Sequence, residues 1–117
     1  MPTSRIAFVT GGGGGIGSEI CRELAKKGHR VAVADLSAES AASIASEING
    51  FAVTCDVADP QSVTAAVRQT QGTLGSVEIL VNCAGWDNFM PFINTDEDFQ
   101  RKVIEINYGG PVRVTRA

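Results

Sequence analysis

The sequence predicts an α/β protein built on a parallel, doubly wound sheet with helices on both faces. Three observations favour this fold class. About four short apolar runs alternate with about four amphipathic stretches along the 117 residues. The connections are short, and turn residues such as Gly28 and Asn49-Gly50 close the amphipathic stretches. No linker or change of composition divides the chain, so we expect one domain over residues 1–117.

The first strand and helix are predicted from the spacing of apolar residues. Ile6–Val9 is a continuous apolar run, which is typical of a strand buried on both faces. Ile16, Ile20 and Leu24 recur every four residues, a spacing that predicts an amphipathic helix ending near Gly28.

The same order then repeats twice. Val31–Ala34 is the second predicted strand, and Ser37 is suited to cap a helix that continues through Ile48. Phe51–Cys55 is the third predicted strand. The Asp59-Pro60 pair predicts the next helix start, because proline fits the first helical position.

A fourth strand and a long helix complete the pattern. Val77–Val81 is the fourth predicted strand. Thr95 is followed three residues later by Asp98, which resembles a capping box and predicts a helix over residues 96–117. Within that helix a local irregularity is expected at Gly109, Gly110 and Pro111.

Charge and cysteine usage exclude several classes of protein. Ten Lys and Arg against thirteen Asp and Glu give a net charge of −3, so we expect neither a nucleic-acid nor a membrane partner. No apolar run suits a bilayer span or a signal peptide, which makes a cytoplasmic location the expectation. Cys21, Cys55 and Cys83 form no C-x-x-C pair, and His29 is the only histidine. We therefore expect reduced thiols, no metal site, and His29 in a surface turn.

Five consecutive glycines, residues 11–15, lie between the first strand and the first helix. A flexible linker is one interpretation, but linkers join domains and this run lies inside one strand-helix unit. The other interpretation is an anion site. The helix start offers unpaired N–H groups, and residues without Cβ let a pyrophosphate approach the backbone. Gly12-x-Gly14-x-x-Gly17 also fits the dinucleotide-binding pattern.

Asp35 ends the second predicted strand, eighteen residues after Gly17. Its carboxylate can accept hydrogen bonds from both hydroxyls of an adenosine ribose; a helix-capping or solvated loop acid is the plainer alternative. Beside the 2′-phosphate of NADP, one charge pair at about 4 Å and an effective dielectric near 20 would cost about 4 kcal/mol. The expected cofactor is therefore NAD.

Several motifs in order resemble those of the short-chain dehydrogenase/reductase family. Thr10-Gly11-x-x-x-Gly15-Ile16-Gly17 is similar to the family's glycine fingerprint, and Asp35 follows the second strand. The later matches are Asp56-Val57, Asn82-Cys83-Ala84-Gly85 and Asn107-Tyr108-Gly109-Gly110. The resemblance covers essentially the whole chain. It implies a Rossmann-type fold of which residues 1–117 form the N-terminal, NAD-binding half.

The resemblance also implies a role for each matching position. The residues expected around the pyrophosphate are Gly11, Gly13, Gly14 and Ile16. Those expected at the adenosine ribose are Asp35 and Leu36, and those at the adenine are Asp56 and Val57. Those expected under the nicotinamide-side ribose are Asn82, Ala84 and Gly85. Asn107 resembles the family's catalytic asparagine, which helps to hold a proton-relay water.

Two positions depart from the family pattern. Cys83 replaces an asparagine and is expected to be a packing substitute. The family's catalytic tyrosine is followed four residues on by a lysine, whereas the only tyrosine here is Tyr108, followed at that spacing by Val112. We therefore expect the Ser/Tyr/Lys part to be missing from this chain, as in a truncated form of a longer protein. A truncated sheet would leave the fourth strand with an unpaired edge.

Trp86, Phe89, Met90 and Phe92 follow the fourth strand, at the edge where open α/β sheets bind ligands. They are expected either to form an apolar wall for the substrate or to pack against the last helix or a second subunit. The stretch is similar to that of family members acting on alicyclic hydroxyacyl-CoA substrates, and more distantly to 3-oxoacyl-carrier-protein reductases.

The leading functional hypothesis is an NAD-dependent oxidoreductase that interconverts a secondary alcohol and a ketone. A non-catalytic NAD-binding module is the alternative, favoured by the missing Tyr/Lys pair. A methyltransferase of similar fold is a third hypothesis, but it gives Asn82 and Asn107 no role. The resemblance further implies a homo-oligomer, commonly a tetramer.

Overall fold

The computed structural model of the protein describes residues 3–117 and confirms the predicted α/β class with its parallel sheet. The sheet has the strand order β3-β2-β1-β4. The strands are β1 (Ile6–Thr10), β2 (Arg30–Asp35), β3 (Phe51–Thr54) and β4 (Ile79–Asn82). Because β1 pairs with both β2 and β4, the chain crosses from one side of β1 to the other between β3 and β4. This arrangement is a Rossmann-like sheet with its topological switch point beside β1.

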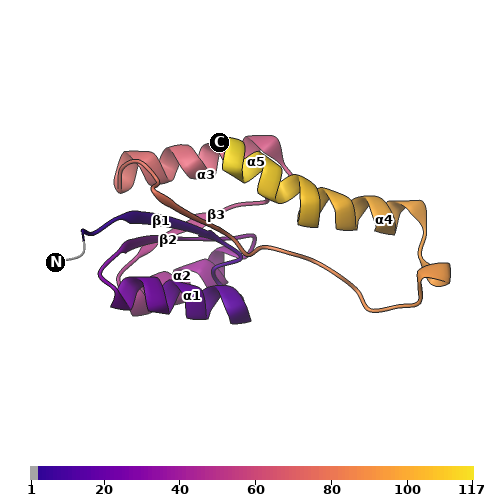
Figure 1. Ribbon diagram of the computed structural model, residues 1–117, viewed down its shortest axis with the longest axis horizontal. Coiled ribbons are helices and arrows are strands. Elements are labelled where there is room, and N and C mark those ends of the chain that lie inside the picture. Colours follow the sequence, from indigo (N-terminus) through magenta and orange to yellow (C-terminus); the bar gives the residue numbers. More distant parts are fainter. Residues whose placement is uncertain (1–2) are drawn as a thin grey trace.

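Helices cover both faces of this sheet (Figure 1). On one face lie α1 (Gly15–Lys26) and α2 (Ala38–Ile48), and on the other lie α3 (Pro60–Thr73) and α5 (Gly110–Arg116). Each face therefore has its own apolar core.

The two cores follow from the alternation of side chains along β1. Val9 points toward the α1 and α2 side, where it packs with Cys21 and Ile44. Its neighbour Phe8 is 1% exposed and points to the opposite side, where it packs among residues that include Val63 of α3. Because side chains on both faces of β1 are buried, successive positions along it are apolar, which explains the continuous apolar run from which this strand was predicted.

The predicted helix caps at Ser37 and Asp59 are confirmed. The Ser37 hydroxyl accepts from the N–H of Ser40 at 3.2 Å, and the Asp59 carboxylate accepts from the N–H of Gln61 at 3.0 Å. Each bond satisfies a backbone donor that the first helical turn leaves unpaired.

The capping box predicted at Thr95 is wrong. The N-cap of α4 (Glu97–Ile104) is Asp96, whose carboxylate accepts from the N–H of Phe99 at 2.8 Å. The Thr95 hydroxyl instead donates to the carbonyl of Phe92 at 2.6 Å, closing the short helical turn η1 (Phe92–Asn94). The Thr95 side chain is therefore bonded to the segment before the helix, and Asp96 caps the helix in its place.

The irregularity predicted near Gly109 is confirmed. The segment between α4 and α5 is a π-helical turn, η2 (Glu105–Gly109), so the long helix is one run with a wide turn in its middle. Pro111 follows directly, in the first turn of α5. Proline inside a helix removes one backbone hydrogen bond and crowds the preceding turn, and a wider turn accommodates both effects.

Strand β4 differs from its prediction and lies at an edge. The prediction of Val77–Val81 was two residues early at its start, because Val77 packs against the core before the strand begins. Within residues 3–117 no strand pairs with the outer side of β4, and Leu80 is only half-buried. An open edge of this kind is what the sequence predicts for the fourth strand.

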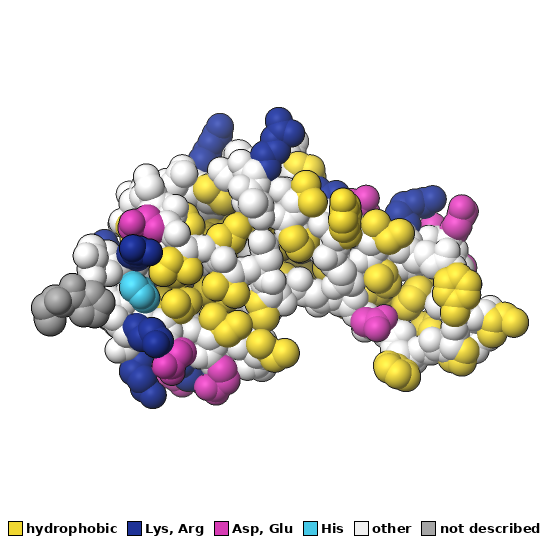
Figure 2. Space-filling view, viewed as in Figure 1, with side chains coloured by type: hydrophobic (Ala, Val, Ile, Leu, Met, Phe, Trp, Pro, Cys, Tyr) yellow, Lys and Arg dark blue, Asp and Glu magenta, His cyan; other side chains and the backbone are white. Residues whose placement is uncertain are grey.

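The segment after β4 extends away from the sheet, and with α4 it gives the molecule its elongated shape of 53 × 25 × 25 Å (Figures 1 and 2). Two large apolar side chains near the tip of this arm, Phe89 and Ile93, are 102% and 88% exposed. None of the helices described in this structure is long and apolar enough to cross a membrane.

The glycine run is held by its neighbours. Gly11 has a φ of +65°, and a Cβ on Gly17 would lie 2.0 Å from the Gly11 carbonyl oxygen. In contrast, a Cβ on Gly15 would meet nothing within 4 Å. The close contact between the Gly11 carbonyl and the first turn of α1 therefore leaves no room for a side chain at Gly17, whereas Gly15 has room for one.

We predict opposite effects for two alanine substitutions in this region. Gly17→Ala is expected to lower the free energy of unfolding by about 2 kcal/mol or more, because the backbone must move to relieve the clash. Gly15→Ala, the matched control, is expected to raise it by up to about 1 kcal/mol through helix propensity. Urea denaturation measures both, and equal losses would contradict this account of the turn.

Candidate functional site

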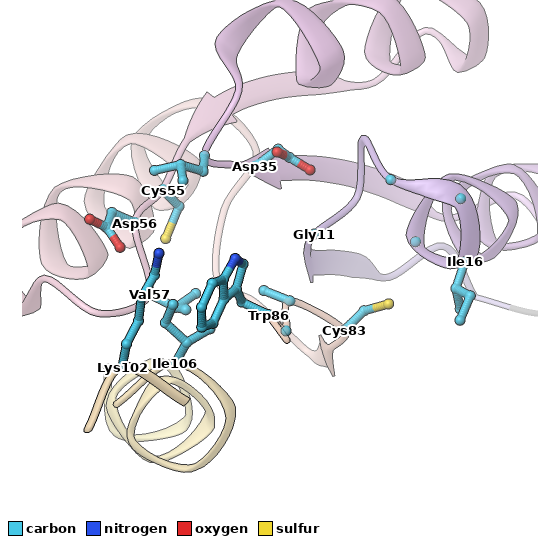
Figure 3. Close-up of a pocket in the computed structure, with 16 residues that line it drawn as sticks. Gly11, Ile16, Asp35, Cys55, Asp56, Val57, Cys83, Trp86, Lys102 and Ile106 are labelled. Carbon is cyan, nitrogen blue, oxygen red and sulfur yellow. The ribbon is translucent and has the colours of Figure 1, made fainter. Parts of the chain in front are cut away.

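One cavity of about 660 Å³ opens at the carboxyl ends of the strands (Figure 3). Its wall is formed by the glycine turn, the residues that follow β2, β3 and β4, and one face of α4 with η2. The lining residues are Gly11, Gly14, Gly15, Ile16, Gly17, Asp35, Leu36, Cys55, Asp56, Val57, Cys83, Ala84, Gly85, Trp86, Lys102 and Ile106. This is the position where open α/β sheets bind ligands.

The start of α1 provides backbone donors to the cavity. The first intrahelical bond is donated by the N–H of Ser18 to the carbonyl of Gly14 at 2.9 Å. The N–H groups of the turn before Ser18 therefore have no acceptor within the helix. No side chain caps α1 at Gly14, unlike α2, α3 and α4. Exposed glycines and the positive end of the helix dipole make this turn suited to an anion.

Asp35 links β2 to the glycine turn. Its carboxylate accepts from the N–H of Gly13 at 3.0 Å and from the N–H of Ser37 at 2.9 Å. A carboxylate has about four lone-pair sites, so it retains acceptor capacity for a hydroxyl group in the cavity. The side chain is partly buried, which fixes its orientation toward the site.

Thr10, at the end of β1, fixes the backbone that follows β4. Its hydroxyl oxygen accepts from the N–H groups of both Cys83 and Ala84, each at 3.1 Å. A Cβ on Gly11 would lie 2.9 Å from the Cα of Ala84, so the two loops touch. The sequence places Thr10 at the end of a buried strand but does not indicate this contact with the loop after β4.

Asp56 and Val57 are held at the other side of the cavity. The Asp56 carboxylate accepts from the N–H of Ala58 at 3.0 Å. The Val57 carbonyl accepts from Arg113 at 3.2 Å, and the same guanidinium donates to the Glu105 carbonyl at 3.0 Å and pairs with the Glu105 carboxylate. Arg113 thus ties the loop after β3 to the π-helical turn.

Asn107 makes three hydrogen bonds with nearby backbone. Its Oδ1 accepts from the N–H of Trp86 at 3.0 Å, and its Nδ2 donates to the carbonyls of Trp86 at 2.7 Å and Val103 at 3.0 Å. Gly85 allows this approach, because a Cβ there would lie 2.8 Å from Oδ1. In this structure Asn107 joins the loop to the helix and does not itself line the cavity.

Lys102 and Ile106 are cavity residues that the sequence analysis missed. They lie four residues apart on α4 and η2, so they share one helix face. The Lys102 ammonium lies 3.8 Å from the centre of the Trp86 ring. That spacing was visible in the sequence, but nothing in the sequence showed which helix face meets the cavity.

The three thiols differ in environment. Burial raises the pKa of Cys21 and the pKa of Cys55 to about 11 each, so both are protonated near neutral pH. Cys83 is half-buried and lines the cavity. Cys55 also lines the cavity but is only 4% exposed, so Cys83 is the more accessible thiol there.

The structure gathers most of the predicted site residues at this cavity. Those that line it are Gly11, Gly14, Ile16, Asp35, Leu36, Asp56, Val57, Ala84 and Gly85. Gly13 lies behind the wall, packed on Ser40. Asn82 also lies outside, where its Nδ2 donates to the Thr115 hydroxyl at 3.2 Å. No set of His, Cys, Asp or Glu in the described part of the chain is arranged to hold a metal ion.

The aromatic segment after β4 is divided between two places. Trp86 lines the large cavity, whereas Phe89, Met90 and Phe92 line a separate hollow of about 200 Å³ on the projecting arm. The structure therefore does not bring these four residues together as one wall.

Comparison with known proteins places this geometry in a family. The family model for short chain dehydrogenase matches residues 5–117. D-threitol dehydrogenase of Mycolicibacterium smegmatis is 36% identical over 120 residues, covering 97% of this chain and 45% of the relative. The chain thus spans less than half the length of that relative.

Two solved structures from Brucella melitensis have the same fold. A 3-ketoacyl-(acyl-carrier-protein) reductase complexed with NADH has a TM-score of 0.91 and 28% identity, covering 96% of this chain and 47% of that chain. A protein described as a ribose-5-phosphate isomerase also has a TM-score of 0.91, with 32% identity over 97% of this chain and 44% of that chain. Fold likeness therefore leaves the reaction open, but the family match over residues 5–117 shows that the chain belongs to the short-chain dehydrogenase/reductase family.

Proposed function

We propose that residues 1–117 are the NAD-binding part of a short-chain oxidoreductase that interconverts a secondary alcohol and a ketone. The observation that carries the proposal is the meeting, at one cavity, of an uncapped helix start and the Asp35 carboxylate. The first suits a pyrophosphate and the second suits a ribose diol. When bound, NAD supplies hydride chemistry: the carbinol carbon loses a hydride to the nicotinamide while its hydroxyl proton leaves to a base, or the reverse.

The cavity residues fit a dinucleotide. Gly14 and Ile16 at the start of α1 would hold the pyrophosphate, with Gly11 shaping the turn. Gly13 would contribute indirectly, since its N–H orients Asp35. Ala84 and Gly85, held by Thr10 and Asn107, would lie under the second ribose. Asn82 lies outside the cavity, so its proposed contribution is structural.

Asp35 is proposed to select NAD over NADP. Leu36, the neighbouring cavity residue, is 70% exposed and carries no charge that could neutralise a 2′-phosphate. A phosphate beside the Asp35 carboxylate would be repelled, while a free ribose diol would donate to it.

Proton transfer is proposed to depend on residues outside this chain. Tyr108 is 72% exposed and does not line the cavity. Residues 1–117 alone would then bind NAD without turnover, and Asn107 would serve the complete active site from the π-helical turn. A non-catalytic NAD-binding module is the alternative, favoured by the absence of a Tyr-x-x-x-Lys motif from the sequence.

The remaining partner assignments are also proposals. A hydroxyacyl-CoA is a candidate substrate, supported by the apolar residues of the arm. A homo-oligomer is supported by Ile104, Tyr108 and Val112, which are more than half exposed and recur every four residues along one helix. A cytoplasmic location agrees with the reduced cysteines.

We predict that Asp35→Asn changes cofactor selection. The variant keeps the shape of the side chain but loses its charge, so its NADH affinity is expected to fall about 10-fold and the preference for NADH over NADPH to shrink by at least about 10-fold. Calorimetric titration with both cofactors measures this. Asp59→Asn, a helix cap outside the cavity, is the control and is expected to change neither affinity. A wild-type protein that binds NADPH as tightly as NADH would contradict the assignment.

We predict that N-ethylmaleimide labels Cys83 first at pH 7.5, because the raised pKa values keep Cys21 and Cys55 protonated and both are buried. Saturating NADH is expected to slow labelling of Cys83 at least about 10-fold by filling the cavity. Peptide mass spectrometry identifies the labelled site, and Cys83→Ser should abolish the rapid phase. Unchanged labelling under NADH concentrations shown to saturate the protein would place the cofactor elsewhere.

A further inference from the structure

Two segments that are far apart in the sequence meet at the side chain of Arg113. Its Nη1 donates to the Val57 carbonyl at 3.2 Å and to the Glu105 carbonyl at 3.0 Å, while Nη2 pairs with the Glu105 carboxylate. The Arg113 side chain is 24% exposed, so most of it is withdrawn from water. A guanidinium presents five N–H donors in one plane, and this geometry suits several acceptors at once.

Pro111 weakens the backbone bonding of the helix beside η2. It has no N–H, so the carbonyls four and five residues before it lose a donor that another residue would supply. Side-chain bonds therefore contribute more than usual to the shape of this turn. The bond from Arg113 to the Glu105 carbonyl is such a bond, and it lies at the first residue of the turn.

The pair Gly109-Gly110 makes room for the guanidinium and for the loop after β3. A Cβ on Gly109 would lie 2.8 Å from Nη1 of Arg113, so the guanidinium lies directly on the backbone of the turn. A Cβ on Gly110 would lie 2.8 Å from Cγ2 of Val57, which is 7% exposed. The turn, the guanidinium and the loop after β3 therefore pack as one unit.

Asn107 belongs to the same turn but does not bond to Arg113. It lies two residues after Glu105, and its side chain bonds to both the N–H and the carbonyl of Trp86. Little freedom is left there, because a Cβ on Gly85 would lie 2.8 Å from Oδ1 of Asn107. A change in the width of the turn would thus move Asn107 and, with it, the loop after β4 that carries Trp86 into the cavity.

We propose that Arg113 is a positioning residue, which acts through η2 to hold Asn107 and Trp86 in a fixed relation to the loop after β3. The bonds that carry this role are those to the Val57 and Glu105 carbonyls. The inference rests on the proposed function in one respect, because Asn107 is proposed to serve the complete active site from this turn. The effect on Trp86 needs no cofactor and can be measured separately.

Trp86 is the only tryptophan in the chain, so its emission in the folded protein reports on the loop after β4. Arg113→Met keeps an unbranched side chain but donates no hydrogen bond. It is expected to shift the emission to the red and to speed its quenching by acrylamide, because the loop is held less tightly. Calorimetry is expected to show NADH affinity lowered about 5-fold, since the cavity wall is no longer preorganised. Arg116→Met removes an exposed arginine from the same helix and is the matched control, expected to change neither signal.

Gly109→Ala tests the same role with Arg113 still present. The backbone of Gly109 has a φ of −63°, so alanine fits it and is favoured by helix propensity. The added methyl group would displace the guanidinium, so the emission should change as in Arg113→Met while the urea midpoint of unfolding does not fall. If Arg113 only stabilised the fold, Arg113→Met would lower the urea midpoint, and both variants would keep the wild-type emission when folded.

The outcomes separate this inference from the proposed function. Wild-type emission in Gly109→Ala and in folded Arg113→Met would overturn the positioning role, whether or not NADH binds. A changed emission without any loss of NADH affinity would contradict the role of Arg113 in fixing the cavity wall. If the wild type does not bind NADH, the proposed function fails, whereas a changed emission still supports the action of Arg113 on Trp86. Gly109→Ala keeps the test decisive even where Arg113→Met does not fold.

Discussion

The close contact between the Gly11 carbonyl and Gly17 fixes where α1 begins, and the cavity depends on that position. A side chain at Gly17 would collide with the carbonyl oxygen at 2.0 Å. Once the helix start is in place, the N–H of Gly12 bonds to the Ala34 carbonyl at 2.9 Å and the N–H of Gly13 bonds to Asp35. Gly12 and Gly13, which would be mobile in a linker, are therefore held against β2. The lack of side chains along the run of five glycines leaves backbone donors open to a ligand.

The regular elements could be predicted because their causes are local. Apolar spacing identified β1 and α1, and the caps at Ser37 and Asp59 need only a suitable side chain before a helix. Thr95 and Asp96 are both suitable caps, and the contact of Thr95 with the preceding turn decides between them. The sequence around Thr95 and Asp96 does not show which of the two caps α4, because the answer depends on the turn that precedes the helix.

The site was less predictable where it depends on how a helix is rotated. Lys102 and Ile106 meet the cavity, and Val114, eight residues after Ile106, continues the same four-residue spacing and packs in the core. An apolar period across residues 96–117 identifies this side of the helix, but it does not show that the first part of the side faces a cavity. Gly13 and Asn82 were expected at the cofactor but lie outside the cavity. A motif gives the order of residues along the chain, but it does not show which of them face the cavity and which face away.

The strand order has a consequence for the time at which the two walls of the cavity form. Pairing of β1 with β2 joins Ala7 to Val31, whereas pairing with β4 joins Ala7 to Ile79, 72 residues away. Closing the longer loop costs about 1 kcal/mol more in chain entropy, so β4 is the slower strand to add. On a ribosome making about 5–20 residues each second, the chain to Ile79 emerges seconds after that to Val31. The residues of the glycine turn and Asp35 therefore leave the ribosome before those of the Trp86 wall, and the cavity can close only after the second group has emerged.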